Sequence, residues 1–159
     1  MSVFTAIETN KINPSGFTVK IFCMFVLLAF TLPAGSGEAK VALIAARGSN
    51  IEVMSIRDIR RLYLGLKSTD NKSVSNPIIN LQSVDLYDEF LKNIMRMTAS
   101  SYKRKQVKAI FRQGREEILE VTSLKELNNH LLENKGDVTF VEITSIESME
   151  NIEVVQILW

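Results

Sequence analysis

The amino-acid sequence predicts an α/β domain with a mainly parallel sheet flanked by helices. Three observations lead to this prediction. Residues 41–46 form an uninterrupted apolar run, strand-like and helix-like segments alternate after it, and capping residues stand at the expected helix boundaries. Alternating strands and helices are typical of α/β folds. Consecutive apolar residues are typical of a strand that is covered on both faces, as in a parallel sheet.

The first strand, residues 40–46, is followed by the loop Gly48-Ser49-Asn50, which consists of turn-forming residues. Ser55 and Asp58 form an approximate capping box for the first helix. The polar residues 67–76 after this helix predict an exposed loop. The helix itself carries its apolar side chains at helical spacing on one face, namely Ile56, Ile59, Leu62, Tyr63 and Leu66.

The second strand is expected at 77–81, and Ser83 is the expected N-cap of the helix after it. In that helix the acidic residues come early and the basic residues late, as the helix dipole favours. A further helix is predicted over about 100–113, and Gly114 is expected to end it.

The last part of the chain is predicted to contain one helix and two strands. Ser123 and Glu126 form a strict capping box at the start of the helix, and Gly136 is its expected C-cap. Strands at 138–143 and 152–158 follow.

Residues 1–39 have the features of a signal peptide. Two lysines precede an apolar run at 21–32, Pro33 ends this run, and Gly37-x-Ala39 fits the small-residue pattern of signal peptidase. The run is shorter than the roughly 20 residues that span a bilayer. We therefore expect export and cleavage after Ala39, which leaves a domain of residues 40–159. The alternative is an uncleaved membrane anchor.

The composition excludes several classes of function. The chain of 159 residues has a net charge of +1, which argues against a nucleic-acid partner. The one cysteine, Cys23, lies in the apolar run, so the domain after it has neither a disulfide nor a thiol nucleophile. The one histidine, His130, lacks the neighbours of a metal site and is expected to be half-buried or on the surface. We expect no enzyme, no cofactor and no metal.

Several segments resemble the periplasmic phosphate-binding proteins of ABC transporters, in which similar motifs occur in the same order. The segments are Arg60-Arg61-Leu62-Tyr63-Leu64-Gly65-Leu66, Ala109-Ile110-Phe111 with Gly114-Arg115, and Gly136-Asp137-Val138-Thr139-Phe140-Val141. The resemblance covers nearly all of residues 40–159. It implies a periplasmic location and a single-lobe domain of the type II periplasmic-binding-protein kind, since about 120 residues have room for one lobe only.

Two loops that leave predicted strands and enter helices are the candidate binding site. Ligands of open α/β sheets bind beyond the carboxyl ends of the strands, and N–H groups at helix N-termini suit an oxyanion. The candidate ligands are therefore Ser49 and Asn50 in one loop and Gln82 and Ser83 in the other, with Arg115 at the rim. Alternatively, the two serines only cap helices and turn the chain.

The chain departs from the family at the oxyanion-binding Ser-Gly-Thr turn, which here reads Ser83-Val84-Asp85. Valine lacks the backbone freedom of glycine, and the Asp85 carboxylate repels an anion. Two functions remain open. One is reversible binding of phosphate or a similar small oxyanion, in association with a membrane transporter. The other is a ligand-free periplasmic interaction module that keeps the fold.

A basic cluster lies in and just after the helix at 100–113 and consists of Lys103, Arg104, Lys105, Lys108, Arg112 and Arg115. One interpretation is a solvated helix face. The other is a surface that docks onto an acidic partner or an anionic lipid surface.

Overall fold

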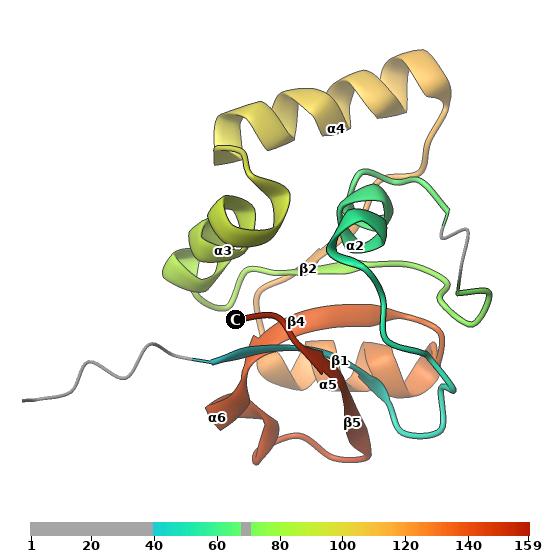
Figure 1. Cartoon of the computed structure of the whole chain (residues 1–159), viewed down its shortest axis with the longest axis vertical. Helices are drawn as coiled ribbons and strands as arrows, with labels where there is room; N and C mark the ends of the chain where they lie inside the picture. The colour runs from blue at the N-terminus through green and yellow to red at the C-terminus, as the bar shows by residue number, and fades with distance from the viewer. Residues whose placement is uncertain (1–39, 68–70) are drawn as a thin grey trace, which may run out of the picture. The chain divides into compact units, whose positions relative to one another are not determined.

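Strand β1 (Val41–Ala46) is the middle strand of a three-stranded antiparallel sheet, between β4 (Val138–Glu142) and β5 (Ile152–Ile157) (Figure 1). This computed structural model describes residues 40–67 and 71–159, which belong to one compact unit. The predicted signal peptide, residues 1–39, lies outside the described residues.

A second sheet contains β2 (Ile78–Asn80) and β3 (Leu119–Val121), which pair in parallel. Strand β2 also runs parallel to β4, because a bridge joins Pro77 to Val138. Side chains extend this junction: Thr139 Oγ1 donates to the Ile78 carbonyl at 3.0 Å, and Asn80 Nδ2 donates to the Phe140 carbonyl at 3.1 Å. The two sheets are thereby held edge to edge.

The predicted single lobe of the periplasmic-binding-protein type, with a mainly parallel sheet, is wrong. Strand β1 pairs antiparallel with both of its neighbours, and parallel pairing among the described residues is limited to the short β2–β3 pair and the single Pro77–Val138 bridge. All six residues of β1 are buried. An apolar run indicates that both faces of a strand are covered. It does not indicate the direction of the strand relative to its neighbours, because that direction depends on the connections between strands.

Helices cover both faces of the three-stranded sheet. The helices are α2 (Ile56–Tyr63), α3 (Val84–Phe90), the π-helical turn η1 (Leu91–Met95), α4 (Ala99–Gln113), α5 (Leu124–Glu133) and the short α6 (Ile143–Ile146). Side chains of α2, α3, η1 and α4 pack with Val41, Leu43 and Ala45. Those of α5 pack with Ala42 and Ile44 on the opposite face. Among the described residues, no helix has the length and apolar character needed to cross a membrane.

Aromatic side chains fill the core between the sheet and the first group of helices. The Phe90 and Phe140 rings stack with their centroids 3.9 Å apart, and Tyr63 lies tilted against Phe90 at 4.7 Å. The Tyr102 hydroxyl donates to the Tyr63 carbonyl at 2.6 Å. Tyr102 is the one fully buried side chain of α4, so this residue anchors the helix to the domain.

The cap predictions were partly correct. Ser55 caps α2 by accepting from the Asp58 N–H at 3.1 Å, and Gly114 ends α4 with a φ of 60°. Ser123 occupies the N-cap position of α5, but its side chain makes no capping hydrogen bond. Helix α5 ends at Glu133 with Asn134 as its C-cap, so the predicted C-cap at Gly136 is wrong.

Candidate functional site

The loop with Ser49 already holds a carboxylate that belongs to the protein itself. Ser49 Oγ donates to Glu153 Oε1 at 2.8 Å, and the Gly48 N–H donates to Glu153 Oε2 at 3.1 Å. These hydrogen bonds lower the pKa of Glu153, with the Gly48 N–H as the largest cause. The Gly48 N–H and the Ser49 hydroxyl are therefore already bonded to a carboxylate of β5. Asn50 is exposed, with a φ of 56°.

Ser83 is the N-cap of α3, and its Oγ accepts from the Leu86 N–H at 3.3 Å. The Gln82 N–H donates to Asn80 Oδ1 at 2.9 Å, and the Gln82 side chain is exposed. These contacts match the capping and turn roles that were the alternative interpretation of this loop.

The structure does not bring the two predicted loops together. Ala45, near the carboxyl end of β1, pairs with Val138, and Val138 bridges to Pro77, just before β2 begins. The carboxyl end of β1 therefore lies beside the start of β2. Ser83 follows the other end of β2, so Ser49 and Ser83 lie at opposite ends of these two neighbouring strands. A composite site would require these two strands to be parallel.

Arg115 is the one predicted site residue that lines a groove of the domain. It follows the Gly114 cap of α4, and its Nη1 donates to the carbonyl of Leu64, the C-cap residue of α2, at 2.6 Å. Arg115 is half-buried. Within the described residues, its other N–H groups have no protein acceptor.

The groove has a volume of about 890 Å³. Its walls come from the segment after α2, the residues before β2, the residues before β3, and the end of α5. Lys67 and Lys72 line it together with Arg115, and Glu116 and Glu117 supply opposite charge. Among the described residues, no lysine or arginine forms a salt bridge with a carboxylate, so these three cations are not neutralised by direct pairing.

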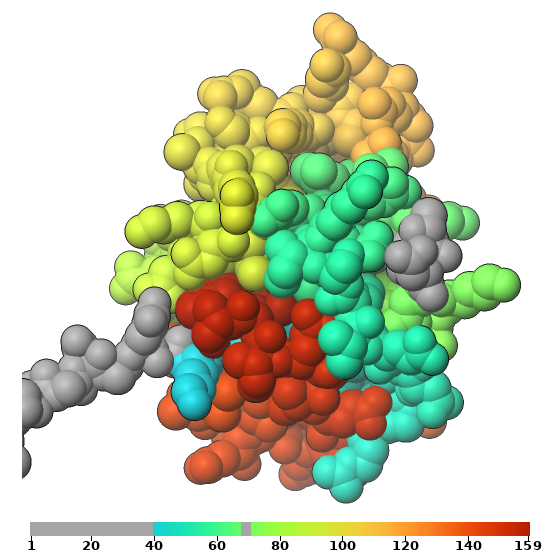
Figure 2. Space-filling view, in the orientation of Figure 1, coloured from blue at the N-terminus to red at the C-terminus, as the bar shows by residue number. Residues whose placement is uncertain are grey.

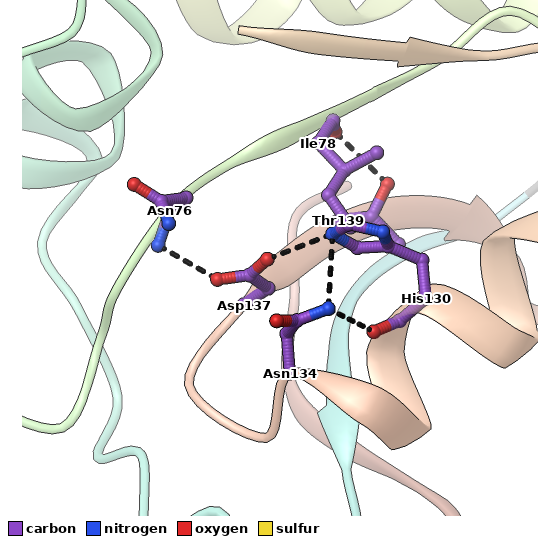
Figure 3. A network of polar contacts seen from close by, with 6 residues as sticks. All are labelled: Asn76, Ile78, His130, Asn134, Asp137 and Thr139. Carbon is purple, nitrogen blue, oxygen red and sulfur yellow. Dashed lines mark hydrogen bonds and ion pairs between the residues drawn. The ribbon is translucent and has the colours of Figure 1, made fainter. Parts of the chain in front are cut away.

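A polar network forms one wall of the groove (Figure 3). Asp137 is 3% exposed. Its Oδ1 accepts from the Asn76 N–H at 3.0 Å, and its Oδ2 lies 3.1 Å from His130 Nε2. Asn134 Nδ2 lies 3.4 Å from the same ring nitrogen and donates to the His130 carbonyl at 3.1 Å. The network ties α5 to the segments that precede β2 and β4.

The contacts of this network hold neighbouring segments together. His130 is half-buried, as expected from the sequence, and the side-chain groups near its ring nitrogen Nε2 among the described residues are the Asp137 carboxylate and the Asn134 amide. A hydroxyl nucleophile is therefore not paired with the imidazole in this part of the chain, as general-base activation would require. The described residues also contain no cluster of three or more metal-ligating side chains.

Sequence reasoning missed Asp137, Lys67 and Lys72 as residues of a common groove. The seven-residue spacing of His130 and Asp137 was a usable signal for their contact. Where a helix ends between two such residues, the chain can turn back and place the second beside the last helical turn. The lysines carried no signal, because isolated lysines in a polar loop are ordinarily solvated.

The chain matches no protein-family model and no curated protein sequence.

Proposed function

We propose that this domain reversibly binds a small oxyanion, such as phosphate or a carboxylate, in the groove lined by Arg115, Lys67 and Lys72, without covalent chemistry. The observation that carries the proposal is the state of Arg115. One nitrogen of its guanidinium is anchored on the Leu64 carbonyl, and its remaining donors have no acceptor among the described residues.

An anchored arginine is well suited to this task. Its planar guanidinium presents donors in a fork that matches the geometry of carboxylate and phosphate oxygens. The contact with Leu64 fixes the plane, so less side-chain freedom is lost when an anion binds. Lys67 and Lys72 are exposed and add positive charge at the same groove.

The binding is expected to be weak. Glu116 and Glu117 line the same groove and oppose an anion. A groove open to solvent also buries a small ligand from fewer sides than an enclosed pocket does. We expect dissociation constants above about 10 µM, or at most roughly 7 kcal/mol of binding free energy.

The cellular role belongs to the same proposal. The signal-peptide features of residues 1–39 and the resemblance to periplasmic phosphate-binding proteins support export to the periplasm and ligand capture in association with a membrane transporter. Because the sheet is antiparallel, the fold does not support this role, and the proposal rests on the groove and on the signal-peptide features of residues 1–39.

Isothermal titration of the chain with phosphate, sulfate and acetate tests the proposal. Arg115→Gln should weaken binding at least tenfold, because it removes the oriented cation. The matched control is Arg57→Gln, which removes an exposed arginine of α2 outside the groove and should leave the affinity unchanged. Absence of heat with all three anions at millimolar concentration would refute the proposal. An equal loss of anion affinity in both variants would show that overall charge, and not the groove, determines the binding.

The second candidate function, an interaction module, is favoured by a different observation, the exposure of helix α4. This observation does not depend on the groove.

A further inference from the structure

Helix α4 is attached to the domain by very little of its surface. It spans 15 residues, and Tyr102 is its one buried side chain. Figure 1 shows α4 on the outside of the helical layer, with α2 and α3 between it and the strands. In the space-filling view its side chains project at the edge of the molecule (Figure 2, yellow to orange). Most of the helix surface is therefore not covered by the other described residues.

The free surface of α4 has an apolar row with cations on either side. Val107 is 42% exposed and Phe111 is 84% exposed, and their four-residue spacing places them one above the other on the helix. Arg104 lies on the same face three residues before Val107, and Lys108 lies there three residues before Phe111. Lys103 is also adjacent, and all three cations are exposed.

The charge of α4 is of one sign only. The helix contains five basic residues and no acidic residue, and none of its cations forms an ion pair within the described residues. Exposure of a phenylalanine ring to water is unfavourable, because burial of its apolar surface lowers the free energy. A helix face that is only solvated therefore gives no reason for Phe111 to be exposed. The combination of unpaired cations and an exposed Phe111 therefore points to a partner that is anionic and has an apolar interior.

We propose that helix α4 docks on an anionic lipid surface, with Phe111 and Val107 entering the boundary between headgroups and acyl chains. The flanking cations then lie at the level of the lipid phosphates. This arrangement is that of an interfacial amphipathic helix, which combines aromatic or aliphatic insertion with lysine and arginine. An acidic protein partner fits less well, because specific protein interfaces bury about 800 Å² on each side, and the apolar row here contains two side chains.

A fluorescent reporter in α4 tests the insertion of the apolar row. Phe111→Trp places an indole at the exposed position, and the spectrum of the parent chain, with Trp159 alone, is subtracted. Vesicles of equal parts phosphatidylcholine and phosphatidylglycerol should shift this emission to the blue, and pure phosphatidylcholine vesicles should not. The matched control is Val53→Trp, at a position that is 75% exposed in the loop before α2, whose emission should stay unshifted.

Charge variants test the electrostatic part. In vesicle flotation, Arg104→Gln combined with Lys108→Gln should lower partitioning by at least tenfold, since each cation near an anionic surface contributes about fivefold. The control pair, Lys125→Gln with Lys135→Gln, removes the same charge on and just after α5 and should have little effect. Both double variants keep the apolar segment at 21–32, so its contribution to vesicle binding is the same in both. The difference in partitioning between them therefore measures the contribution of α4 alone.

Three results would overturn the proposal. The first is an unshifted Phe111→Trp emission with anionic vesicles. The second is an equal loss of partitioning in the two charge pairs. The third is an emission shift with poly-glutamate but not with anionic vesicles, which would assign α4 to an acidic protein partner instead.

Discussion

Asp137 provides the sharpest test of how the groove wall is held. It is almost completely buried, and it accepts hydrogen bonds from the Asn76 N–H and from His130. Asp137→Ala removes both acceptors and leaves the Asn76 N–H without its partner. Asp137→Asn keeps the shape and an acceptor for Asn76 but removes the charge.

The expected magnitudes follow from these contacts. A hydrogen bond to a charged group contributes about 1.5–3 kcal/mol when it is buried, and His130 is half-exposed, which reduces its share. We expect Asp137→Ala to lower the free energy of unfolding by about 3 kcal/mol and Asp137→Asn by about 1 kcal/mol. At a urea m-value of about 2 kcal/mol per molar, the alanine variant should unfold at a midpoint about 1.5 M lower.

Urea unfolding followed by far-UV circular dichroism measures these changes. The control is Asp85→Asn, an exposed carboxylate in the first turn of α3, which should cost a few tenths of a kcal/mol. A double-mutant cycle of Asp137→Asn with His130→Gln should give a coupling energy above about 0.5 kcal/mol. If Asp137→Ala cost no more than the Asp85 control, the network would not hold the groove wall.

Four further predictions concern other contacts. Hydrogen bonds from Gly48 and Ser49 lower the pKa of the Glu153 carboxyl group in the folded state. The ionised carboxylate therefore stabilises the fold above the pKa that Glu153 has in the unfolded chain, and this contribution is lost as the pH falls through its pKa in the folded state. In chemical denaturation, the difference in unfolding free energy between wild type and Glu153→Gln should shrink between neutral pH and about pH 3. An unchanged difference would contradict this. Burial raises the pKa of Tyr63 and Tyr102, so tyrosinate absorbance from them should appear only with alkaline unfolding above about pH 10, and a reversible titration within the folded state would show that the rings are accessible. Ser83→Ala should cost about 1 kcal/mol in urea unfolding through the lost α3 cap and leave phosphate affinity unchanged in calorimetry; weaker phosphate binding would return Ser83 to the site. N-terminal sequencing of the exported protein should read Lys-Val-Ala-Leu, whereas Met1 on membrane-bound material would identify an anchor.

Local sequence patterns predicted the elements of this domain well. Strands β1, β2, β4 and β5 and helices α2, α3, α4 and α5 all lie where periodicity and turn residues placed them. Ser55 and Gly114 act as the predicted caps. Strand β3 has only three residues, Leu119–Val121, and was missed. It carries too little periodicity to stand out, and its pairing with β2 is what makes it a strand.

The candidate site was predicted less well, because it depends on contacts between distant residues. Arg115 was placed at a groove rim from its position after Gly114, and it does line the groove. The partner of Ser49 is Glu153, which is 104 residues away in the chain. No local pattern identifies that carboxylate, so the loop looked open to an external anion when the fold had already supplied one.

The sequence by itself determined what is local: most of the strands and helices, which faces are apolar, and that β1 is covered on both sides. Only the tertiary structure decided the direction of the strands, and with it which loops share an edge. Hydrophobic burial depends on how much apolar area is removed from water and is indifferent to strand direction. The same buried β1 is therefore compatible with a parallel or an antiparallel sheet, and the antiparallel arrangement separates Ser49 from Ser83 and leaves Arg115 with Lys67 and Lys72 in the groove.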